Sequence, residues 1–162
     1  MREIAAEVGV RAGALYLYTP DKQTLLFDLM ADHLDALLTE WREADPQTSP
    51  VARLRAFVEF HLGYHFDRRD AVFLAYMELR NLTPENFGAV EAKRRAYEAE
   101  LERILVLGAE SGDFLIEDAR ISTMALIAML TGPHVWYRED GRLTREAIQT
   151  MYWHMTNRMV TA

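Results

Sequence analysis

Hydrophobic residues recur three to four positions apart along nearly the whole chain, and no stretch alternates for long between apolar and polar residues. A spacing of three to four places apolar side chains on one face of an α-helix, whereas strict alternation is typical of a half-buried strand. The pattern therefore predicts an all-α protein. Two very short helices are expected at the front, followed by longer ones at about residues 21–44, 50–69, 70–81 and 121–132 and from 145 onward. A further helix is expected from residue 84 to a stop near Gly108 or Gly112.

Start signals precede most of these helices. Thr19-Pro20, Ser49-Pro50 and Thr83-Pro84 each place a hydroxyl side chain before a proline, the order that favours an N-cap followed by the first helical residue. Thr144 is the expected cap of the last helix. The helix expected at 21–44 carries one stripe of mostly apolar residues, made of Leu26, Leu29, Met30, His33, Leu37 and Trp41.

The last two helices predict an interface. Residues 121–132 are apolar almost all the way round, so this helix must be covered on two sides. The final helix also has an apolar stripe, with Ala147, Ile148, Met151, Tyr152, Met155 and Met159. Either these helices fold back on their own core, or a second copy of the chain covers them in a four-helix interface. We expect a homodimer formed through residues 117–160.

Bulk composition narrows the class of protein. Of the 162 residues, 50% are hydrophobic and 27% charged, which is typical of a folded domain or of a small head joined to a larger body. The chain has no cysteine, which excludes disulfides and thiolate metal sites. Its apolar runs are too short to span a membrane and no secretion signal opens it, so a cytoplasmic protein is expected. No nucleophile elbow, P-loop or dinucleotide-binding motif is present, so neither an enzyme nor a cofactor is expected.

The negative charge lies in the body. The formal net charge is −7, whereas a protein that binds nucleic acid neutralises phosphates with Lys and Arg. Residues 1–22 hold three basic and three acidic side chains, so the first segment is neutral and the acidic excess follows it. This distribution is compatible with DNA binding by the front of the chain, without being evidence for it.

The opening stretch IAAEVGVRAGALYLYTPDK, residues 4–22, has the order of a helix-turn-helix. Gly9 can supply the positive φ of a tight turn, and Ala12, Gly13 and Ala14 keep the second helix slim enough to approach the floor of a major groove. On spacing alone, a helical hairpin without DNA contacts remains the alternative.

The order of residues in this stretch resembles the helix-turn-helix of the tetracycline-repressor (TetR) family. Members typically read Ile-Ala-x-x-x-Gly-Val, then Gly-x-Leu-Tyr, then an aromatic pair and Lys-x-x-Leu. The matching positions here are Ile4, Ala5, Gly9, Val10, Gly13, Leu15, Tyr16, Tyr18, Lys22 and Leu25.

The resemblance implies a ligand-responsive transcriptional regulator, expected to be a repressor, that binds a palindromic double-stranded DNA operator. Residues 12–17 would form the recognition helix, and Arg11 and Ala12 would face base edges. Tyr16, Tyr18 and Lys22 would contact phosphates. The implied organisation is a DNA-binding head with its connecting helix at residues 1–44 and a ligand-binding and dimerisation domain at 45–162.

Two departures from the family pattern affect the head. Thr19 stands where the family most often has Phe, and the family has a further helix before this motif. A head without that helix is expected to be incomplete, with an uncovered side at Ile4, Val8 and Leu15. The alternative function is therefore a dimeric small-molecule-binding module that does not bind DNA.

Three later segments are similar to bodies of the same family, namely YMELRNLTPENF, RRAYEAELERIL and LTGPHVWYREDGRLT. The similar branch includes regulators of fatty-acid, steroid and aromatic-acid breakdown, several of which respond to acyl-coenzyme A thioesters, which implies a small apolar or acyl-coenzyme A-like effector. A pocket among the middle helices is expected to be lined by adaptable apolar side chains, although plain core packing would explain them equally. The candidate ligand-binding residues of this kind are Phe73, Tyr76, Met77, Met124, Met129 and Trp136.

Three polar residues complete the candidate ligand site. His61 and His65 lie four apart on one helix face and are either hydrogen-bonded core residues, polar pocket contacts or, with further ligands, a zinc site. Without an evident third ligand, no metal is expected. Arg80 either pairs with a carboxylate such as Glu78 or meets an anionic group of the effector.

Overall fold

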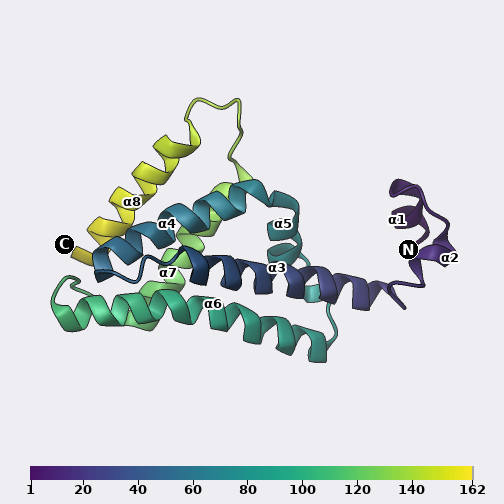
Figure 1. Cartoon of the computed structure of the whole chain (residues 1–162), viewed down its shortest axis with the longest axis horizontal. Helices are drawn as coiled ribbons and strands as arrows, with labels where there is room; N and C mark the ends of the chain where they lie inside the picture. The colour runs from purple at the N-terminus through teal and green to yellow at the C-terminus, as the bar shows by residue number, and fades with distance from the viewer. Residues whose placement is uncertain (162) are drawn as a thin grey trace.

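The computed structural model describes residues 1–161, apart from the side chain of Ala12, and every regular element in that part is helical. Figure 1 shows a small head at one end, a long connecting helix, and a body of packed helices that holds the C-terminus at the other end. The elements are α1 (Arg2–Glu7), α2 (Ala12–Leu15), α3 (Lys22–Ala44), α4 (Pro50–Asp67), α5 (Arg69–Met77), η1 (Leu79–Asn81), α6 (Pro84–Ser111), α7 (Ala119–Thr131), η2 (Gly132–Val135) and α8 (Arg145–Thr161). The all-α prediction is confirmed.

Most of the predicted helix starts are present. The side chains of Ser49, Thr83 and Thr144 each accept a hydrogen bond from a backbone N–H three residues later, at 3.2–3.4 Å. The exception is α3, where the cap is Asp21, whose carboxylate accepts from the Thr24 N–H at 2.8 Å. Predicting Thr19 as this cap was wrong, because its hydroxyl instead donates to the carbonyl of Asp21 at 3.1 Å.

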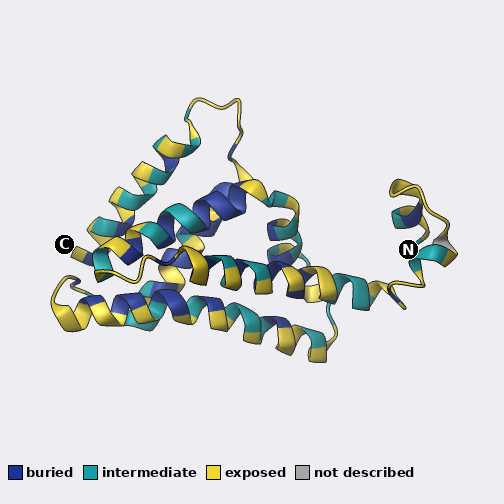
Figure 2. Ribbon diagram, in the orientation of Figure 1, coloured by how far each residue is buried: buried dark blue, intermediate teal, exposed yellow. Residues whose placement is uncertain are grey.

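The core of the body forms around α4. This helix contacts α3, α6, α7 and α8, and Figure 2 shows its surface to be largely buried. Trp41 from α3 packs edge-on against Phe57 of α4, with ring centroids 4.9 Å apart, and both side chains are fully buried. One predicted member of the α3 stripe differs, since Leu29 is 48% exposed while Leu34 is buried in its place.

A buried ion pair closes the turn between α3 and α4. The guanidinium of Arg53 donates to both carboxylate oxygens of Asp45, at 2.9 and 2.6 Å. Burial alone would raise the pKa of Asp45, but the hydrogen bonds and charge of Arg53 hold it below its usual value. Two parallel hydrogen bonds compensate for desolvation, so the pair fixes the angle at which the chain enters α4.

Along the described residues, no helix is both long enough and apolar enough to cross a membrane.

Candidate functional site

The head consists of two short helices joined by a tight turn. Gly9 has a φ of 71°, a left-handed conformation that favours glycine. The turn lets the Val10 N–H donate to the Ala5 carbonyl at 2.9 Å, and the Ala5 side chain is buried between the helices. The sequence therefore forms the two helices and the glycine turn that a helix-turn-helix requires.

The described side chains with a predicted DNA role all lie on the surface of the head. Arg11, Tyr16, Tyr18 and Lys22 are exposed, whereas the side chain of Ala12 lies outside the described residues. Lys22 begins α3, so it sits at the end of the helix where backbone N–H groups point outward. These positions leave the polar tips of the four side chains accessible to a duplex.

Apolar side chains of the head are also accessible. Val8 is exposed and Leu17 is 84% exposed, while Ile4 and Leu15 are half-buried. Figure 2 shows little buried surface in the head compared with the body. The packing of α1 against α2 alone covers only a small core.

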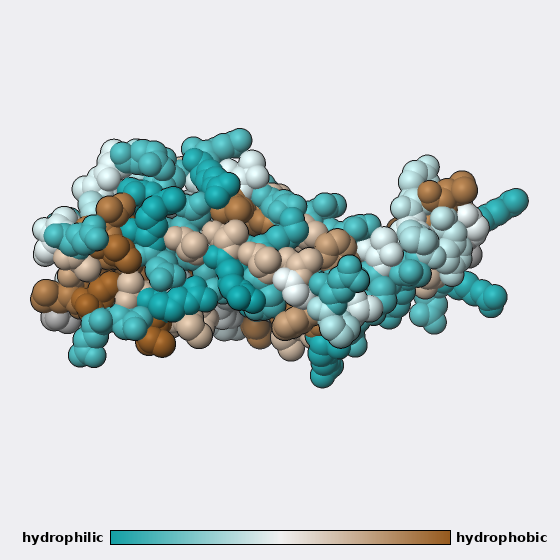
Figure 3. Space-filling view, turned by 90° about the horizontal axis from the view of Figure 1, so that it is seen from below, coloured by the Kyte–Doolittle hydropathy of each residue, from teal (hydrophilic) through white to brown (hydrophobic). Residues whose placement is uncertain are grey.

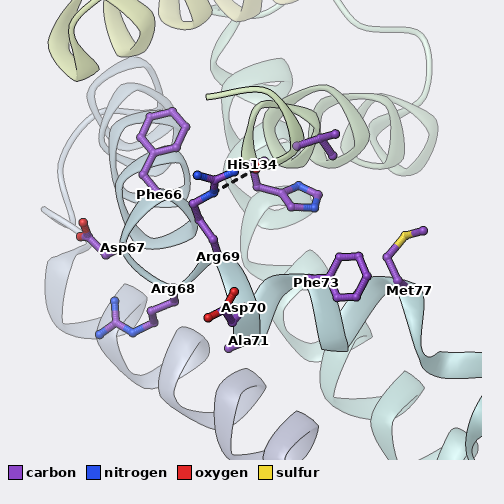
Figure 4. A pocket seen from close by; sticks show the side chains of 10 residues that line it. Phe66, Asp67, Arg68, Arg69, Asp70, Ala71, Phe73, Met77 and His134 are labelled. Carbon is purple, nitrogen blue, oxygen red and sulfur yellow. Dashed lines mark hydrogen bonds between the residues drawn. The ribbon is translucent and has the colours of Figure 1, made fainter. Parts of the chain in front are cut away.

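A pocket of about 740 Å³ opens on the body between α5, the end of α4 and η2. Figure 4 shows Phe73 and Met77 side by side on one face of α5, with the ring of His134 opposite them. Phe66 closes the far end. The position of α5 follows from the break after Asp67, because the chain turns there and α5 leaves α4 at an angle (Figure 1).

Two arginines, Arg68 and Arg69, line the polar side of this pocket, and they differ in how many hydrogen bonds their guanidinium groups already make. Arg68 donates to both carboxylate oxygens of Glu40, at 2.8 and 3.1 Å, and lies over the Tyr64 ring. Arg69 donates only its Nε–H, to the His134 carbonyl at 3.3 Å, as the dashed line in Figure 4 marks. The Arg69 guanidinium is therefore the cation best placed to meet an anionic group in the pocket.

Behind the pocket, His61 takes part in a complete hydrogen-bond chain. Its Nδ1 lies 3.1 Å from the Tyr97 hydroxyl and its Nε2 lies 3.1 Å from the Thr131 hydroxyl, which in turn donates to Tyr76 Oη at 3.4 Å. Burial and the neighbouring histidines His65 and His33 lower the pKa of His61 well below its ordinary value. His61 is thus a neutral residue whose two ring nitrogens are both satisfied.

His65 and His33 are buried but incompletely paired. His65 is 1% exposed and stacks on His61 with centroids 3.8 Å apart; its Nε2 has no partner in the described structure. His33 is 6% exposed, comes from α3, and leaves both ring nitrogens without a partner there. Burial lowers the pKa of His33 to about 4, with Arg68 adding to the effect, and burial lowers that of His65 to about 3.

The structure separates the predicted ligand-binding residues into groups. Phe73 and Met77 line the pocket, Tyr76 lies between the pocket and the histidines, and His61 and His65 lie deeper. The others lie outside the lining of this pocket. Arg80 is exposed on η1, Met124 is 52% exposed on α7, Met129 is half-buried, and Trp136 borders a second pocket of about 250 Å³.

Several residues of the site were missed by sequence reasoning. His33 was assigned to the apolar stripe of its helix, and Arg69 and His134 were not considered. The signal for His33 was present, because a histidine at a core position needs a hydrogen-bond partner. A further arginine beside the site is Arg94, whose guanidinium lies 4.6 Å from the centroid of the Tyr76 ring and pairs with Glu91 at 3.7 Å.

Within the described residues, there is no group of three or more His, Asp or Glu side chains that could hold a metal ion.

Comparison with known proteins identifies the family. The sequence model described as "Tetracyclin repressor-like, C-terminal domain" matches residues 47–160. This match spans more than half of the chain, and the protein therefore belongs to the tetracycline-repressor-like family of transcriptional regulators. Among curated proteins, none matches this sequence.

Solved structures of regulators share the fold over nearly the whole chain. A bacterial regulatory protein of the TetR family from Rhodococcus RHA1 is 28% identical, with a TM-score of 0.92, over 99% of this chain and 85% of the other. PfmR from Thermus thermophilus is 27% identical, with a TM-score of 0.88, over 97% and 86%. AibR, in complex with isovaleryl coenzyme A and operator DNA, is 25% identical, with a TM-score of 0.88, over 95% and 84%. The predicted TetR-like fold is confirmed.

Proposed function

We propose that this protein is a dimeric, DNA-binding repressor that a small apolar or acyl-coenzyme A-like effector releases from its operator. The family membership supports a regulatory role, and the similarity to AibR, a protein solved with both an acyl-coenzyme A and operator DNA, supports the two ligand classes. Such a regulator would act in the cytoplasm, where it would meet its operator. The proposed division is a DNA-binding head with its connecting helix at residues 1–44 and an effector-binding and dimerisation domain at 45–162.

The observation that carries the proposal is the surface of the head. Tyr16, Tyr18 and Lys22 are exposed beside α2 and would contact phosphates, which positions the helix without reading sequence. Arg11 and Ala12, at the start of α2, would reach base edges in the major groove. An arginine can form two hydrogen bonds with guanine, and an alanine methyl can contact a thymine methyl.

Dimerisation would pair the outer faces of α7 and α8. These faces present large apolar side chains that the rest of the described chain leaves exposed, namely Ile121, Met124, Met151, Met155 and Met159. Figure 3 shows hydrophobic side chains gathered at the end of the body opposite the head. A two-fold axis through this interface, within residues 117–160, would place one head in each of two major grooves about 34–36 Å apart.

The effector would occupy the pocket beside α5. Phe73 and Met77 offer an apolar wall for an acyl chain, and Arg69 would meet an anionic group at the mouth. Tyr76, His61 and His65 would form the inner boundary. For Arg80, Met124, Met129 and Trp136, the remaining predicted ligand residues, contact with the effector stays a prediction.

Coupling between pocket and head would pass through the start of α3. The pocket wall α5 continues into η1, and the Gln23 side chain bonds this connection twice, accepting from the Thr83 N–H at 3.1 Å and donating to the Asn81 carbonyl. An effector that shifts α5 would therefore pull on the first turn of α3 and tilt the head. A small change in the distance between the two heads would weaken binding at both half-sites together. The dimer with bound effector would then have a lower affinity for the operator than the dimer without it, and this difference in affinity is what release requires.

Isovaleryl-coenzyme A is a suitable first probe of this coupling. Fluorescence anisotropy of a labelled operator duplex would be measured while the probe is added to the protein–DNA complex. The proposal predicts that operator affinity falls at least ten-fold at saturating probe. A probe that binds the protein tightly, as calorimetry would show, and leaves operator affinity unchanged would refute the coupling.

The exposed apolar side chains of the head favour a second candidate, a dimeric small-molecule-binding module that does not bind DNA. Val8 and Leu17 in particular remain accessible. This alternative predicts effector binding with no affinity for any duplex above the non-specific level. Measuring DNA binding separately from effector binding distinguishes the two functions.

A further inference from the structure

The interior of the body contains a pair of histidines whose hydrogen-bonding capacity is unused. His65 from α4 and His33 from α3 face each other edge to face, with ring centroids 6.5 Å apart and an interplanar angle of 78°. Three ring nitrogens of the pair lack a partner in the described structure, His65 Nε2 and both nitrogens of His33. A buried polar atom without a partner costs about 1–3 kcal/mol, so the arrangement points to a ligand group.

The tautomer of His65 follows from its one hydrogen bond. Its Nδ1 lies 2.7 Å from the carbonyl oxygen of His61, and a carbonyl can only accept. The proton of a neutral His65 is therefore on Nδ1, and Nε2 carries an unshared electron pair. A partner at this position must donate a hydrogen bond.

His33 can donate a hydrogen bond to the same group to which His65 offers only an acceptor. A neutral imidazole has one N–H donor and one acceptor nitrogen, and both are free here. A single oxygen that makes two hydrogen bonds of about 2.8 Å joins nitrogens that are roughly 4–5 Å apart, which suits two rings at this separation. Such an oxygen would donate to His65 and accept from His33.

We infer that the effector carries a hydroxyl group on an otherwise apolar body, and that His65 and His33 hold this hydroxyl by accepting and donating one hydrogen bond, respectively. This inference rests on the proposed effector-binding role of the body. The inference specifies the polar group at the buried end of the effector, whereas the apolar wall of the pocket specifies only an apolar body.

Other polar groups fit the pair less well. A ketone, ether or thioester oxygen only accepts, so it would leave His65 Nε2 unpaired. A carboxylate also only accepts, and it would bring a charge to two neutral rings. Arg68, which lies over the neighbouring Tyr64 ring, already pairs with Glu40. An alcohol or phenol satisfies both rings without a buried charge.

One ring separates the pocket from the histidine pair. The Tyr76 ring centroid lies 6.4 Å from that of His134, which lines the pocket, and 6.4 Å from that of His65. The Tyr76 ring thus stands between the pocket and the pair, and a ligand that extends inward from the pocket reaches the pair by displacing this ring. Because His33 belongs to α3, a hydroxyl held there would also contact the helix that carries the head.

A matched set of probes tests the inference on the full chain. Binding of 4-propylphenol, 4-propylanisole, propylbenzene and 4-propylbenzoate is measured by isothermal titration calorimetry. The four share one apolar body and differ only in the group at its end. We expect the phenol to bind about ten-fold or more tightly than each of the others, since it alone both donates and accepts at that position.

Variants then assign the preference to the pair. In His65→Leu the phenol and the methyl ether should bind equally, whereas His65→Gln, whose amide oxygen still accepts, should keep part of the preference. Equal binding of all four probes by the unaltered chain, binding of none, or tightest binding of the benzoate would each overturn the inference, even if a variant failed to fold. DNA binding is measured separately, so a chain that prefers the phenol but binds no operator would refute only the regulatory role.

Discussion

The side-chain oxygen of Gln23 accepts a hydrogen bond from the backbone N–H of Thr83 at 3.1 Å, although the two residues are 60 positions apart. Gln23 lies in the first turn of α3, next to the head, and Thr83 caps α6. The same side chain also donates to the Asn81 carbonyl. This contact fastens the start of the connecting helix to the segment that follows the pocket wall α5.

Removing this contact is predicted to weaken the link between effector and DNA. In Gln23→Ala, effector affinity should stay within about two-fold, while the effect of the effector on operator affinity falls several-fold, since coupling energies of this kind are about 1–3 kcal/mol. The measurement is operator binding with and without saturating effector. Gln149→Ala is the control, because Gln149 makes a similar side-chain bond to the Glu59 carbonyl at 2.8 Å, within the body. Equal losses in both variants would contradict the assignment.

Stability is predicted to fall as the pH drops below about 6.5. The pKa values of His33 and His65 are lowered to about 4 and about 3, so between these values and 6.5 the unfolded chain binds protons that the folded chain does not. Each such group lowers the unfolding free energy by up to about 1.4 kcal/mol per pH unit. Burial opposes the protonation of both rings, the charge of Arg68 adds to this for His33, and His33 and His134 add to it for His65. The hydrogen bond from His65 to the His61 carbonyl acts in the opposite direction and favours protonation.

Urea unfolding at pH 7, 6, 5 and 4.5 would measure this dependence. The aspartates with lowered pKa values, Asp21, Asp45 and Asp67, lose their contribution only as the pH falls below about 4, and Glu146 loses its contribution below about 4.5, so this window isolates the histidines. His33→Leu should reduce the slope of the unfolding free energy against pH by about the contribution of one histidine. A profile that is flat from pH 7 to 4.5 in the unaltered protein would show that the pair is not held neutral.

The buried Arg53–Asp45 pair is predicted to contribute much more to the stability of the body than the exposed Arg55–Glu59 pair nearby. Arg53→Met leaves the buried Asp45 carboxylate uncompensated and should reduce the unfolding free energy by about 3–5 kcal/mol. Arg55→Met removes the exposed pair with Glu59, at 2.8 Å, and should cost at most about 1 kcal/mol. Denaturant unfolding of the two variants gives the comparison, and similar losses would contradict it.

The α7–α8 face is predicted to hold the dimer together. Met155→Glu places a charge among the exposed methionines of this face and should convert the dimer to monomers at micromolar concentration. Leu29→Glu makes the same kind of change on an exposed part of α3, and this variant should remain dimeric. Sedimentation velocity measures the outcome. A monomeric unaltered chain, or a dimer that tolerates Met155→Glu, would remove this interface from the account.

The fold was predictable because local signals and periodicity agree. Ser49, Thr83 and Thr144 each precede a helix in the sequence and cap it in the structure. The start of α3 differs because two polar residues compete for the cap, and the carboxylate of Asp21 is the one that reaches the Thr24 N–H. Such competition is decided by a single backbone turn, which periodicity does not report.

The site was less predictable because it depends on contacts between distant segments. His61 and His65 drew attention through their spacing, but their partner His33 lies on another helix, and no sequence pattern connects them. Arg69 lines the pocket, whereas Arg80 is exposed on η1 outside the pocket lining, and nothing in the two local sequences indicates this difference. Met77 and Met124 are about equally exposed, at 56% and 52%, and they differ in place, since Met77 lines the pocket whereas Met124 lies on α7 outside it.

DNA reading by the head can be measured by selection from a pool of randomised duplexes, followed by fluorescence anisotropy of the selected duplex at two salt concentrations. If the head reads DNA, the selection should enrich one palindrome, with half-sites about one helical turn apart or a multiple of it. Binding should weaken steeply with salt, and Lys22→Ala should reduce the salt dependence by about one phosphate contact. No enriched sequence, with only salt-sensitive binding that Lys22→Ala and Tyr18→Ala leave unchanged, would contradict it.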